Sequence, residues 1–295
     1  MACIGFIGLG AMGSGMAGVL AAAGHTVLAH DLDAAAVAAA VAKGCTAAGS
    51  VSGACAGADA VITMLPTGTH ARAVHAGPGG VFEAAPRGAV LADCSTIAVE
   101  DARWLHGEAD ARGHVFVDAP VSGGVAAAAA GTLAFMVGGS EAAFAAARPI
   151  LDPMAKAVFH AGGAGAGQAA KICNNMLLAV SMIGTCEAFV LAEQLGLEPK
   201  AFFDIAAQSS GQCWSLTSYA PVAGLVPTAP ANRGFEGGFA GALMLKDVRL
   251  ALEAAAQAGV SPRMAQIAGE IYGEYVSNYN STRDFSGVID MLRKQ

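Results

Sequence analysis

The sequence has few charged and few aromatic residues. Of its 295 residues, 13% are Asp, Glu, Lys or Arg and 6% are Phe, Trp or Tyr, whereas 55% are hydrophobic and 39 are glycine. It contains no run of lysines or arginines, and its formal net charge is -7. Because proteins that bind nucleic acid usually carry a basic patch, we expect no nucleic-acid partner. The low charge instead predicts helices that are buried or packed in a homodimer or homotetramer.

Cysteines and histidines with metal-ligand spacing are lacking as well. The seven cysteines are scattered, odd in number and never form Cys-x-x-Cys, so the sequence indicates neither a disulfide framework nor a zinc site. The seven histidines do not form a pattern such as His-Glu-x-x-His. We therefore predict no metal site and a reducing, cytoplasmic compartment.

No Asp, Glu, Lys or Arg precedes Asp31, so the first segment could be read as a signal peptide or a membrane anchor. A signal peptide needs a basic start, which this segment lacks. Glycines at positions 5, 8, 10, 13, 15 and 18 are too frequent for a stable spanning helix. We expect no membrane partner, and an N-terminal anchor is kept as an alternative.

The same segment divides into a strand, a turn, a helix and a second strand. An apolar run at 3–7 is followed by G-x-G-x-x-G at 8–13, a helical pattern at 14–23 and the strand-like HTVLAH at 25–30. This order, closed by an acidic residue, is the dinucleotide-binding fingerprint. Its turn brings a helix N-terminus to the pyrophosphate, and its carboxylate accepts from the ribose and disfavours the 2′-phosphate of NADP. NAD is therefore the predicted cofactor, and the predicted contacts are Gly8, Gly10, Ala11, Met12, Gly13 and Asp31.

Apolar strands continue to alternate with helices as far as residue 162. Strands are predicted at 60–66, 89–95, 114–120, 133–139 and 157–162, and helices at 34–42 and 141–151. This alternation predicts a mostly parallel sheet covered on both faces. After it, helical patterns occupy 166–195, 200–207, 239–258 and 262–274.

The chain is therefore predicted to be an α/β protein in two domains. A Rossmann-like N-terminal domain with a mostly parallel sheet would span 1–162, and an all-α C-terminal domain for substrate binding and oligomerisation would span 163–295. The long helix at 166–195 is expected to form one wall of the cleft between them. The alanine-rich stretch at 125–131 is interpreted as compositional bias or as helix filler.

Six segments resemble those of the β-hydroxyacid dehydrogenase family. They are GFIGLGAMGSGMA, MLPTGTH, DCSTIA, DAPVSGGVAAAAAGTL, GAGQAAKICNNML and FAGALMLKD, in the family's order. The resemblance extends to about residue 252, and QSSGQCWSL resembles the branch that acts on 3-hydroxyisobutyrate. It implies an NAD-dependent dehydrogenase with a Rossmann-like domain and a helical domain that includes subunit contacts.

The resemblance also implies the roles of individual residues. Lys171 corresponds to the catalytic acid/base, and Asn175, one helical turn later, helps hold the substrate. The substrate carboxylate would be bound by Ser122, Gly123 and Gly124. Further cofactor contacts are implied at Leu65, Pro66, His70, Thr96, Phe239 and Lys246. His70 departs from the family, in which Asn is common at this position.

Trp214 and Tyr219 leave two interpretations open. They could pack in a core or interface, or they could form a compact apolar lid over a small substrate. The second interpretation makes Trp214 a substrate-binding residue and suits a methyl-bearing acid better than glycerate.

The implied chemistry needs a group that moves a proton. Because a free lysine has a pKa of about 10.4, we expect burial and a nearby cation such as Lys246 to lower the pKa of Lys171. The expected reaction is the oxidation of 3-hydroxyisobutyrate to methylmalonate semialdehyde, as in valine degradation. The alternatives are a tartronate semialdehyde reductase, a broad 3-hydroxyacid or serine dehydrogenase, and a non-catalytic NAD-binding sensor.

Overall fold

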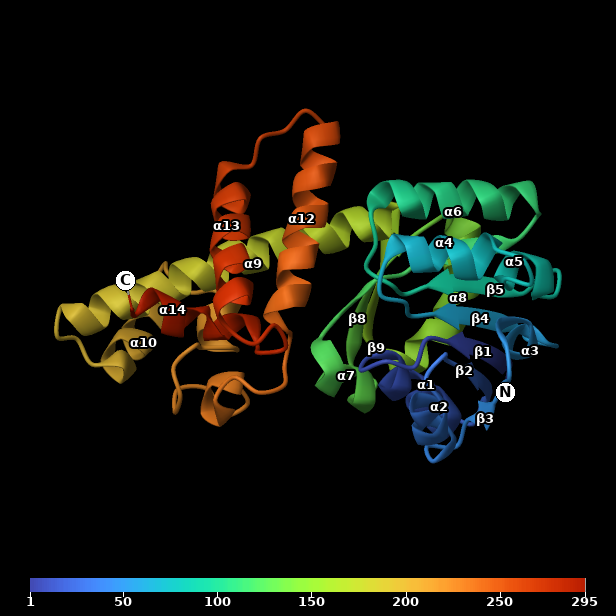
Figure 1. Ribbon diagram of the computed structural model, residues 1–295, viewed down its shortest axis with the longest axis horizontal. Coiled ribbons are helices and arrows are strands. Elements are labelled where there is room, and N and C mark those ends of the chain that lie inside the picture. The colour runs from blue at the N-terminus through green and yellow to red at the C-terminus, as the bar shows by residue number, and fades with distance from the viewer. Residues whose placement is uncertain (295) are drawn as a thin grey trace. The chain divides into compact units, whose positions relative to one another are not determined.

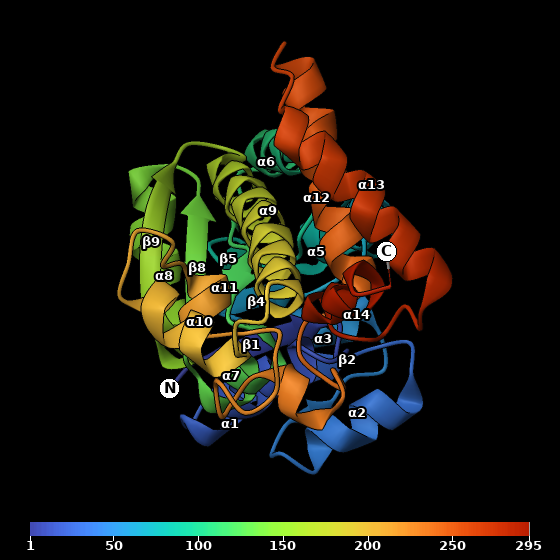
Figure 2. The same ribbon diagram turned by 90° about the vertical axis from the view of Figure 1, so that its left-hand side faces the viewer.

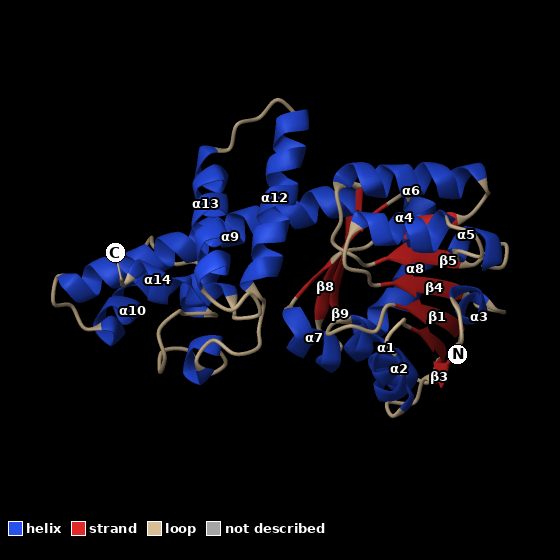
Figure 3. Ribbon diagram, in the orientation of Figure 1, coloured by secondary structure: helices blue, strands red, loops and turns tan. Residues whose placement is uncertain are grey.

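The computed structural model describes residues 1–294. They form two compact units, Met1–Lys171 and the part from Ile172 onward. Figure 3 shows that the named strands all belong to the first unit, whereas the second is built from helices and loops. The predicted α/β fold followed by an all-α part is confirmed. Helix α9 (Ala166–Gln194) begins in the first unit and continues into the second. The predicted domain boundary at 162/163 precedes this helix and stays a prediction.

The first unit contains a nine-stranded sheet. The strand order is β3-β2-β1-β4-β5-β6-β8-β7, and β9 pairs with β8. Neighbouring strands from β3 to β6 run parallel, whereas β8 is antiparallel to β6 and β7. The strands are β1 (Cys3–Ile7), β2 (Thr26–His30), β3 (Thr46–Ala47), β4 (Ala60–Thr63), β5 (Val90–Asp93), β6 (Val115–Asp118), β7 (Val121–Ser122), β8 (Leu133–Gly138) and β9 (Ala155–Gly162). The chain order reverses between β1 and β4, and the carboxyl ends of strands at such a reversal usually form the ligand crevice.

The central strands are apolar on both sides because helices cover both faces of the sheet (Figure 1). Along β4, for example, Val61 and Ile62 belong to separate hydrophobic cores. One core is lined by α1 (Gly13–Ala22), α2 (Ala34–Val41), α7 (Gly124–Ala130) and α8 (Glu141–Leu151). The other is lined by α3 (Val51–Cys55), α4 (Gly68–Ala76), α5 (Val81–Ala84) and α6 (Val99–Ala111). A short 3-10 helix, Asp152–Met154, leads from α8 to β9.

The alanine-rich stretch forms helix α7, in line with the alternative that it is helix filler. This helix packs closely against α1, because a Cβ on Gly15 would lie 3.0 Å from the backbone carbon of Ala128 and from the backbone nitrogen of Ala129. Small side chains on both helices are what permit this approach. Helix α7 therefore helps to fix α1, the helix that follows the glycine turn.

The N-terminal segment forms β1 and α1, as the dinucleotide-binding interpretation predicted, and not one long spanning helix. Strand β1 lies inside the sheet, paired with β2 and β4. Among residues 1–294, α9 alone is long and apolar enough to cross a membrane, and 44% of its most apolar window is buried. Its buried side chains include Met182, Cys186 and Phe189, which belong to the hydrophobic core of the second unit.

The second unit packs its helices around that core. The helices after α9 are α10 (Pro199–Ala207), α11 (Trp214–Thr217), α12 (Gly241–Gln257), α13 (Arg263–Asn278) and α14 (Ile289–Leu292), with 3-10 turns at Pro230–Arg233 and Phe285–Val288. Helices α12 and α13 lie side by side in both views (Figures 1 and 2). The largest buried side chains of this core include Tyr272, Tyr275 and Phe285.

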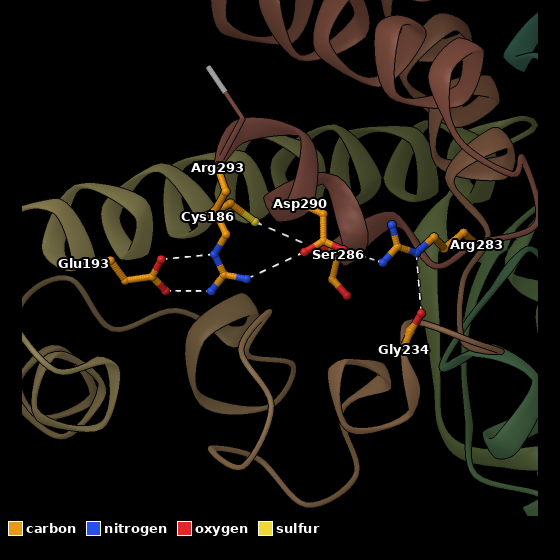
Figure 4. Close-up of polar contacts among 7 residues, drawn as sticks. All are labelled: Cys186, Glu193, Gly234, Arg283, Ser286, Asp290 and Arg293. Atoms are coloured by element: carbon orange, nitrogen blue, oxygen red, sulfur yellow. Dashed lines mark hydrogen bonds and ion pairs between the residues drawn. The ribbon is translucent and has the colours of Figure 1, made fainter.

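Polar contacts tie the carboxyl-terminal segment to α9 (Figure 4). Arg293 donates to both carboxylate oxygens of Glu193, at 3.0 and 2.6 Å, and lies 3.6 Å from Asp290. Arg283 also pairs with Asp290 and donates to the carbonyl of Gly234 at 3.4 Å. The last described helix is therefore fixed to the same unit that begins at Ile172.

Candidate active site

The glycine turn follows β1 and opens toward the N-terminus of α1. Gly8 has φ +96, and a Cβ there would lie 2.2 Å from the carbonyl oxygen of Met64. A Cβ on Gly13 would lie 1.9 Å from the carbonyl oxygen of Gly8. Gly10 is different, because it is exposed and a Cβ there would meet no atom within 4 Å. Gly8 and Gly13 thus shape the turn, and Gly10, beside the exposed Ala11 and partly buried Met12, leaves backbone accessible to a ligand.

Asp31 follows β2 and is fixed against this turn. Its Oδ2 accepts a hydrogen bond from the N–H of Leu9 at 2.6 Å, and its Oδ1 accepts from the N–H of Asp33 at 2.9 Å. The carboxylate is only partly buried, so its remaining lone pairs can accept from ribose hydroxyls. The turn and this carboxylate together fit a dinucleotide.

A buried polar cluster lies under the loops that follow β4 and β5. Thr63 and Ser95 each donate to Asp93 Oδ1 at 2.6 Å, and the N–H of Leu65 donates to Ser95 Oγ at 2.8 Å. His75 Nε2 lies 3.0 Å from Thr63 Oγ1. Because Thr63 gives its proton to Asp93, the ring nitrogen must donate here. This cluster fixes the backbone at Leu65, a predicted cofactor contact.

Burial sets the charge of this cluster. It lowers the pKa of His75 to about 3, so the ring is neutral at physiological pH. Burial also raises the pKa of Asp93, against the opposing effect of the hydrogen bonds from Ser95 and Thr63. His75 Nδ1 and Asp93 Oδ2 are buried and have no hydrogen-bond partner in the structure. The cluster is therefore sensitive to protonation.

The other predicted contacts near these loops are more accessible. Pro66 and His70 are exposed, and Thr96 is partly buried. The His70 ring is hydrogen-bonded through Nδ1 to Thr67 Oγ1 at 2.7 Å, and Thr67 caps α4 by accepting from the His70 N–H. The ring is thus held at the start of α4, and its cofactor contact stays a prediction.

The segment predicted to bind the substrate carboxylate lies between β7 and α7. Ser122 ends β7, Gly123 has φ +135 and Gly124 has φ +72. A Cβ on Gly123 would lie 2.7 Å from the Cβ of Ala127, whereas one on Gly124 would meet no atom within 4 Å. Two consecutive left-handed residues turn the chain sharply here, and Ser122 supplies a hydroxyl at the turn.

Asp118, the last residue of β6, caps the helix that carries Lys171. Its carboxylate is fully buried and accepts from the N–H groups of Gly165 and Gln168, each at 2.9 Å. His106 Nε2 lies 2.8 Å from the same carboxylate. Since a carboxylate satisfies the open N–H groups at a helix start, Asp118 attaches the first turn of α9 to the edge of the sheet. Lys171, 6% exposed, follows on this helix.

Asn175 lies one helical turn after Lys171 on the same face of α9. In the second unit its Nδ2 donates to Asp247 Oδ2 at 2.6 Å, and its Oδ1 accepts from Asn174 at 3.0 Å. Lys246 Nζ lies 3.8 Å from Asp247 Oδ1. The carboxylate of Asp247 therefore orients Asn175 and offsets part of the positive charge of Lys246.

Trp214 belongs to an aromatic stack in the second unit. Its indole is 51% exposed and stacks on the Tyr219 ring with the centroids 4.8 Å apart. The Tyr219 hydroxyl donates to Asp284 Oδ2 at 2.8 Å, and the Phe239 N–H donates to the same oxygen at 2.7 Å. Burial and the neighbouring Asp284 raise the pKa of Tyr219, so it stays neutral. The buried Asp284 thus links Trp214, through Tyr219, to Phe239.

Models of two protein families match the chain. The first, described as the NAD binding domain of 6-phosphogluconate dehydrogenase, matches residues 3–163. The second, described as the NAD-binding domain of NADP-dependent 3-hydroxyisobutyrate dehydrogenase, matches residues 165–292.

Among curated relatives, a probable 3-hydroxyisobutyrate dehydrogenase of Mycobacterium tuberculosis is 47% identical over 99% of this chain and 98% of its own length. The chain belongs to the β-hydroxyacid dehydrogenase family. An NAD-dependent L-serine dehydrogenase of Pseudomonas aeruginosa is 46% identical over 97% of this chain and 96% of its own. A solved structure of the M. tuberculosis 3-hydroxyisobutyrate dehydrogenase with L-serine has a TM-score of 0.94, with 47% identity over 99% of both chains.

The predicted family, dehydrogenase activity and NAD binding are thereby confirmed. In this dehydrogenase the carboxyl edge of the sheet brings together the glycine turn, Asp31, the Leu65 loop and the Thr96 loop. The second unit holds Asn175, Trp214, Phe239 and Lys246. The roles of the individual residues stay predictions.

Sequence reasoning missed the buried polar residues that hold these groups: Asp93, Ser95, Asp118, Gln168, Asp247 and Asp284. The first five lie inside the segments that resemble the family, and this position could have identified them as candidate site residues. Most of their other partners, however, are distant in sequence: Thr63 is 30 residues from Asp93, and Asn175 is 72 residues from Asp247.

Proposed function

We propose that this dehydrogenase oxidises 3-hydroxyisobutyrate to methylmalonate semialdehyde, with NAD as the acceptor and Lys171 as the general acid/base. The observation that carries the proposal is a buried lysine on a helix capped from the cofactor-binding sheet by Asp118. Relatives that are named as probable or known 3-hydroxyisobutyrate dehydrogenases and that match over 98–99% of their own length support the substrate. The reaction would serve valine degradation.

The chemistry divides between the cofactor and the chain. Bound NAD supplies the carbon that accepts the hydride. Lys171 takes the hydroxyl proton as the alcohol is oxidised, and it returns a proton to the carbonyl oxygen in the opposite direction. Asn175 has one amide hydrogen bonded to Asp247, so the other remains for the substrate. Ser122, Gly123 and Gly124 bind the substrate carboxylate through a hydroxyl and backbone N–H groups.

The choice of NAD over NADP rests on Asp31. Its carboxylate is held at the glycine turn by the Leu9 N–H, where it favours ribose hydroxyls and repels a 2′-phosphate. Around this turn we assign Gly8, Gly10, Ala11, Met12 and Gly13 to the pyrophosphate. We assign the nicotinamide end to Leu65, Pro66, His70, Thr96, Phe239 and Lys246.

Trp214 is proposed as an apolar cover for the methyl group of the substrate. Its exposed indole supports this role, because half of the side chain remains available after stacking on Tyr219. The second candidate function is L-serine oxidation. It is favoured by the P. aeruginosa relative and by the solved M. tuberculosis structure with L-serine.

Self-association in the cytoplasm completes the proposal. Leu177 and Leu191 of α9 are 65% and 61% exposed, and Leu195, in the turn directly after this helix, is 76% exposed. These exposed leucines support a homodimer or homotetramer that covers them. Light scattering should then give a mass of two or four times 29.2 kDa. The cysteine pattern supports the reducing compartment.

The test is a panel of initial rates. NAD and NADP reduction would be followed with 3-hydroxyisobutyrate, 3-hydroxypropionate, L-serine and glycerate. We expect the highest kcat/KM with NAD and 3-hydroxyisobutyrate. A higher value with L-serine would move the substrate to the second candidate, and no turnover with any acid would overturn the proposal.

A further inference from the structure

Gln168 holds the loop that carries Thr96. The Gln168 side chain is fully buried, its Nε2 donates to the carbonyl of Ser95 at 2.7 Å, and its Oε1 accepts from the N–H of Ile97 at 3.1 Å. The two bonds fall on either side of Thr96, a residue assigned to the cofactor. A single amide therefore fixes this loop with both its donor and its acceptor.

The backbone of Gln168 is held by a different residue, Asp118. Its N–H donates to Asp118, which also accepts from Gly165. The preceding Gly167 is packed against the sheet, because a Cβ there would lie 2.3 Å from the carbonyl oxygen of Met136 and 2.6 Å from that of Asp118. The first turn of α9 thus has little freedom to slide or rotate.

Lys171 lies one helical turn after Gln168, on the same face of α9. A change at Gln168 would therefore alter the placement of Lys171 relative to the Thr96 loop. Because a misplacement of about 1 Å can slow a reaction roughly 100-fold, such a change should affect the chemical step more than binding.

We propose that Gln168 is a positioning residue that sets the placement of Lys171 relative to the Thr96 loop, and through it the rate of the proton-transfer step. This proposal rests on the proposed function, since it takes Lys171 as the acid/base. It assigns no contact between Gln168 and the substrate. Its effect is expected in kcat rather than in KM.

The first test compares Gln168→Met with a matched control, His114→Phe. Methionine keeps the length of the side chain and removes both hydrogen bonds. His114 is also buried and hydrogen-bonded, to the carbonyl of Phe82 at 2.9 Å, but it precedes β6 and so lies at the sheet edge opposite Asp118. Both variants lose buried hydrogen bonds in the first unit, and only one of them touches the Thr96 loop.

For Gln168→Met we expect kcat to fall about 10- to 100-fold, with KM for the hydroxyacid and the Kd of NAD within about twofold of the parent. Substrate deuterated at the reacting carbon should show a larger isotope effect, because chemistry becomes slower. For His114→Phe, kcat should stay within about twofold. Equal losses in the two variants, or a loss confined to the Kd of NAD, would overturn the proposal. Gln168→Asn, too short to make both bonds, replaces Gln168→Met if the latter does not fold.

The second test needs no turnover. Hydrogen exchange would be compared at residues 95–97 and 165–171 in the parent, Gln168→Met and His114→Phe. We expect faster exchange in both segments only in Gln168→Met. If the parent oxidises no acid of the panel, the proposed function fails. Unchanged exchange in both segments of Gln168→Met would independently overturn the positioning role of Gln168.

Discussion

The carboxylate of Asp31 and the backbone N–H of Leu9 are joined by a hydrogen bond of 2.6 Å. This bond connects the end of β2 to the turn after β1, so one side chain both shapes the glycine turn and presents an acceptor beside it. The cofactor preference of the dehydrogenase can be tested at this pair.

Asp31→Ser should weaken NAD binding and reduce the discrimination against NADP. Loss of a hydrogen bond to a charged group costs about 1.5–3 kcal/mol, so KM for NAD should rise roughly 10- to 100-fold. Asp33→Ala is the matched control, since Asp33 caps α2 through the Ala35 N–H. That variant should lose stability and keep its preference for NAD. An unchanged ratio of NADP to NAD activity in Asp31→Ser would contradict the assignment.

Two glycines of the turn should respond differently to alanine. Gly13→Ala places a Cβ 1.9 Å from the carbonyl oxygen of Gly8 and should destabilise the fold by at least about 1–3 kcal/mol. Gly10→Ala meets no atom within 4 Å, so the melting temperature should be preserved while NAD binding is lost. Calorimetry and fluorescence titration measure the two effects. Normal NAD affinity in Gly10→Ala would show that the pyrophosphate does not lie close to the backbone at Gly10.

Lys171→Ala should lower kcat by about 10²- to 10⁴-fold, the usual contribution of a general acid/base. The Kd of NAD should change little, because the glycine turn and Asp31 are untouched. Lys200→Ala serves as control: this lysine pairs with Asp204 on α10 and should keep full activity. Retention of more than about a tenth of kcat in Lys171→Ala would contradict the acid/base role.

His75 should make the protein sensitive to acid. Burial lowers its pKa from 6.5 to about 3. As the pH falls below 6.5, His75 is therefore protonated in the unfolded chain but stays neutral in the native protein, and this difference favours unfolding. His75 should therefore cost the native state about 2 kcal/mol between pH 6.5 and 4.5.

His75→Gln keeps an N–H that can face Thr63 and has no such proton to bind. Urea unfolding at both pH values should show a smaller decrease in the variant, with parallel behaviour from pH 7 to 8. Equal decreases in parent and variant would show that His75 is not the group responsible.

Trp214→Ala should raise KM for 3-hydroxyisobutyrate about three- to tenfold and change KM for glycerate less, since a methyl contact is worth about 1 kcal/mol. Because the indole is 51% exposed, the melting temperature should change little. A large loss of stability with no change in KM would instead favour the core interpretation.

The sequence predicted local features better than long-range ones. The turn at 8–13 and Asp31 could be found because each part of the βαβ unit follows the last in the chain. Asp118 could not be interpreted in the same way, since it looks like the end of a strand and one of its donors, Gln168, is 50 residues away. Asp284 likewise accepts from Tyr219, 65 residues earlier.

The shortest elements were also missed. Strand β7 has two residues, Val121 and Ser122, which is too few for a period-two pattern. The predicted strand at 60–66 ends at Thr63 in the structure, because the following Leu65 N–H bonds to a serine side chain instead of a neighbouring strand. One deviation lies at a segment assigned to the substrate and the other at a loop assigned to the cofactor, where function competes with regular structure.

The shared helix α9 constrains how related enzymes could exchange parts. In a hybrid joined between 162 and 163, Asp118 would come from one parent and the N–H groups of Gly165 and Gln168 from the other. Nothing would then ensure that the carboxylate and these N–H groups have the geometry for hydrogen bonds. A junction after Lys171 inherits the strand end, the helix start and the lysine as one block from a single parent. Swapping the remaining helices at that later point would exchange Asn175 and Trp214, and it would keep Lys171 together with Asp118 and the start of α9.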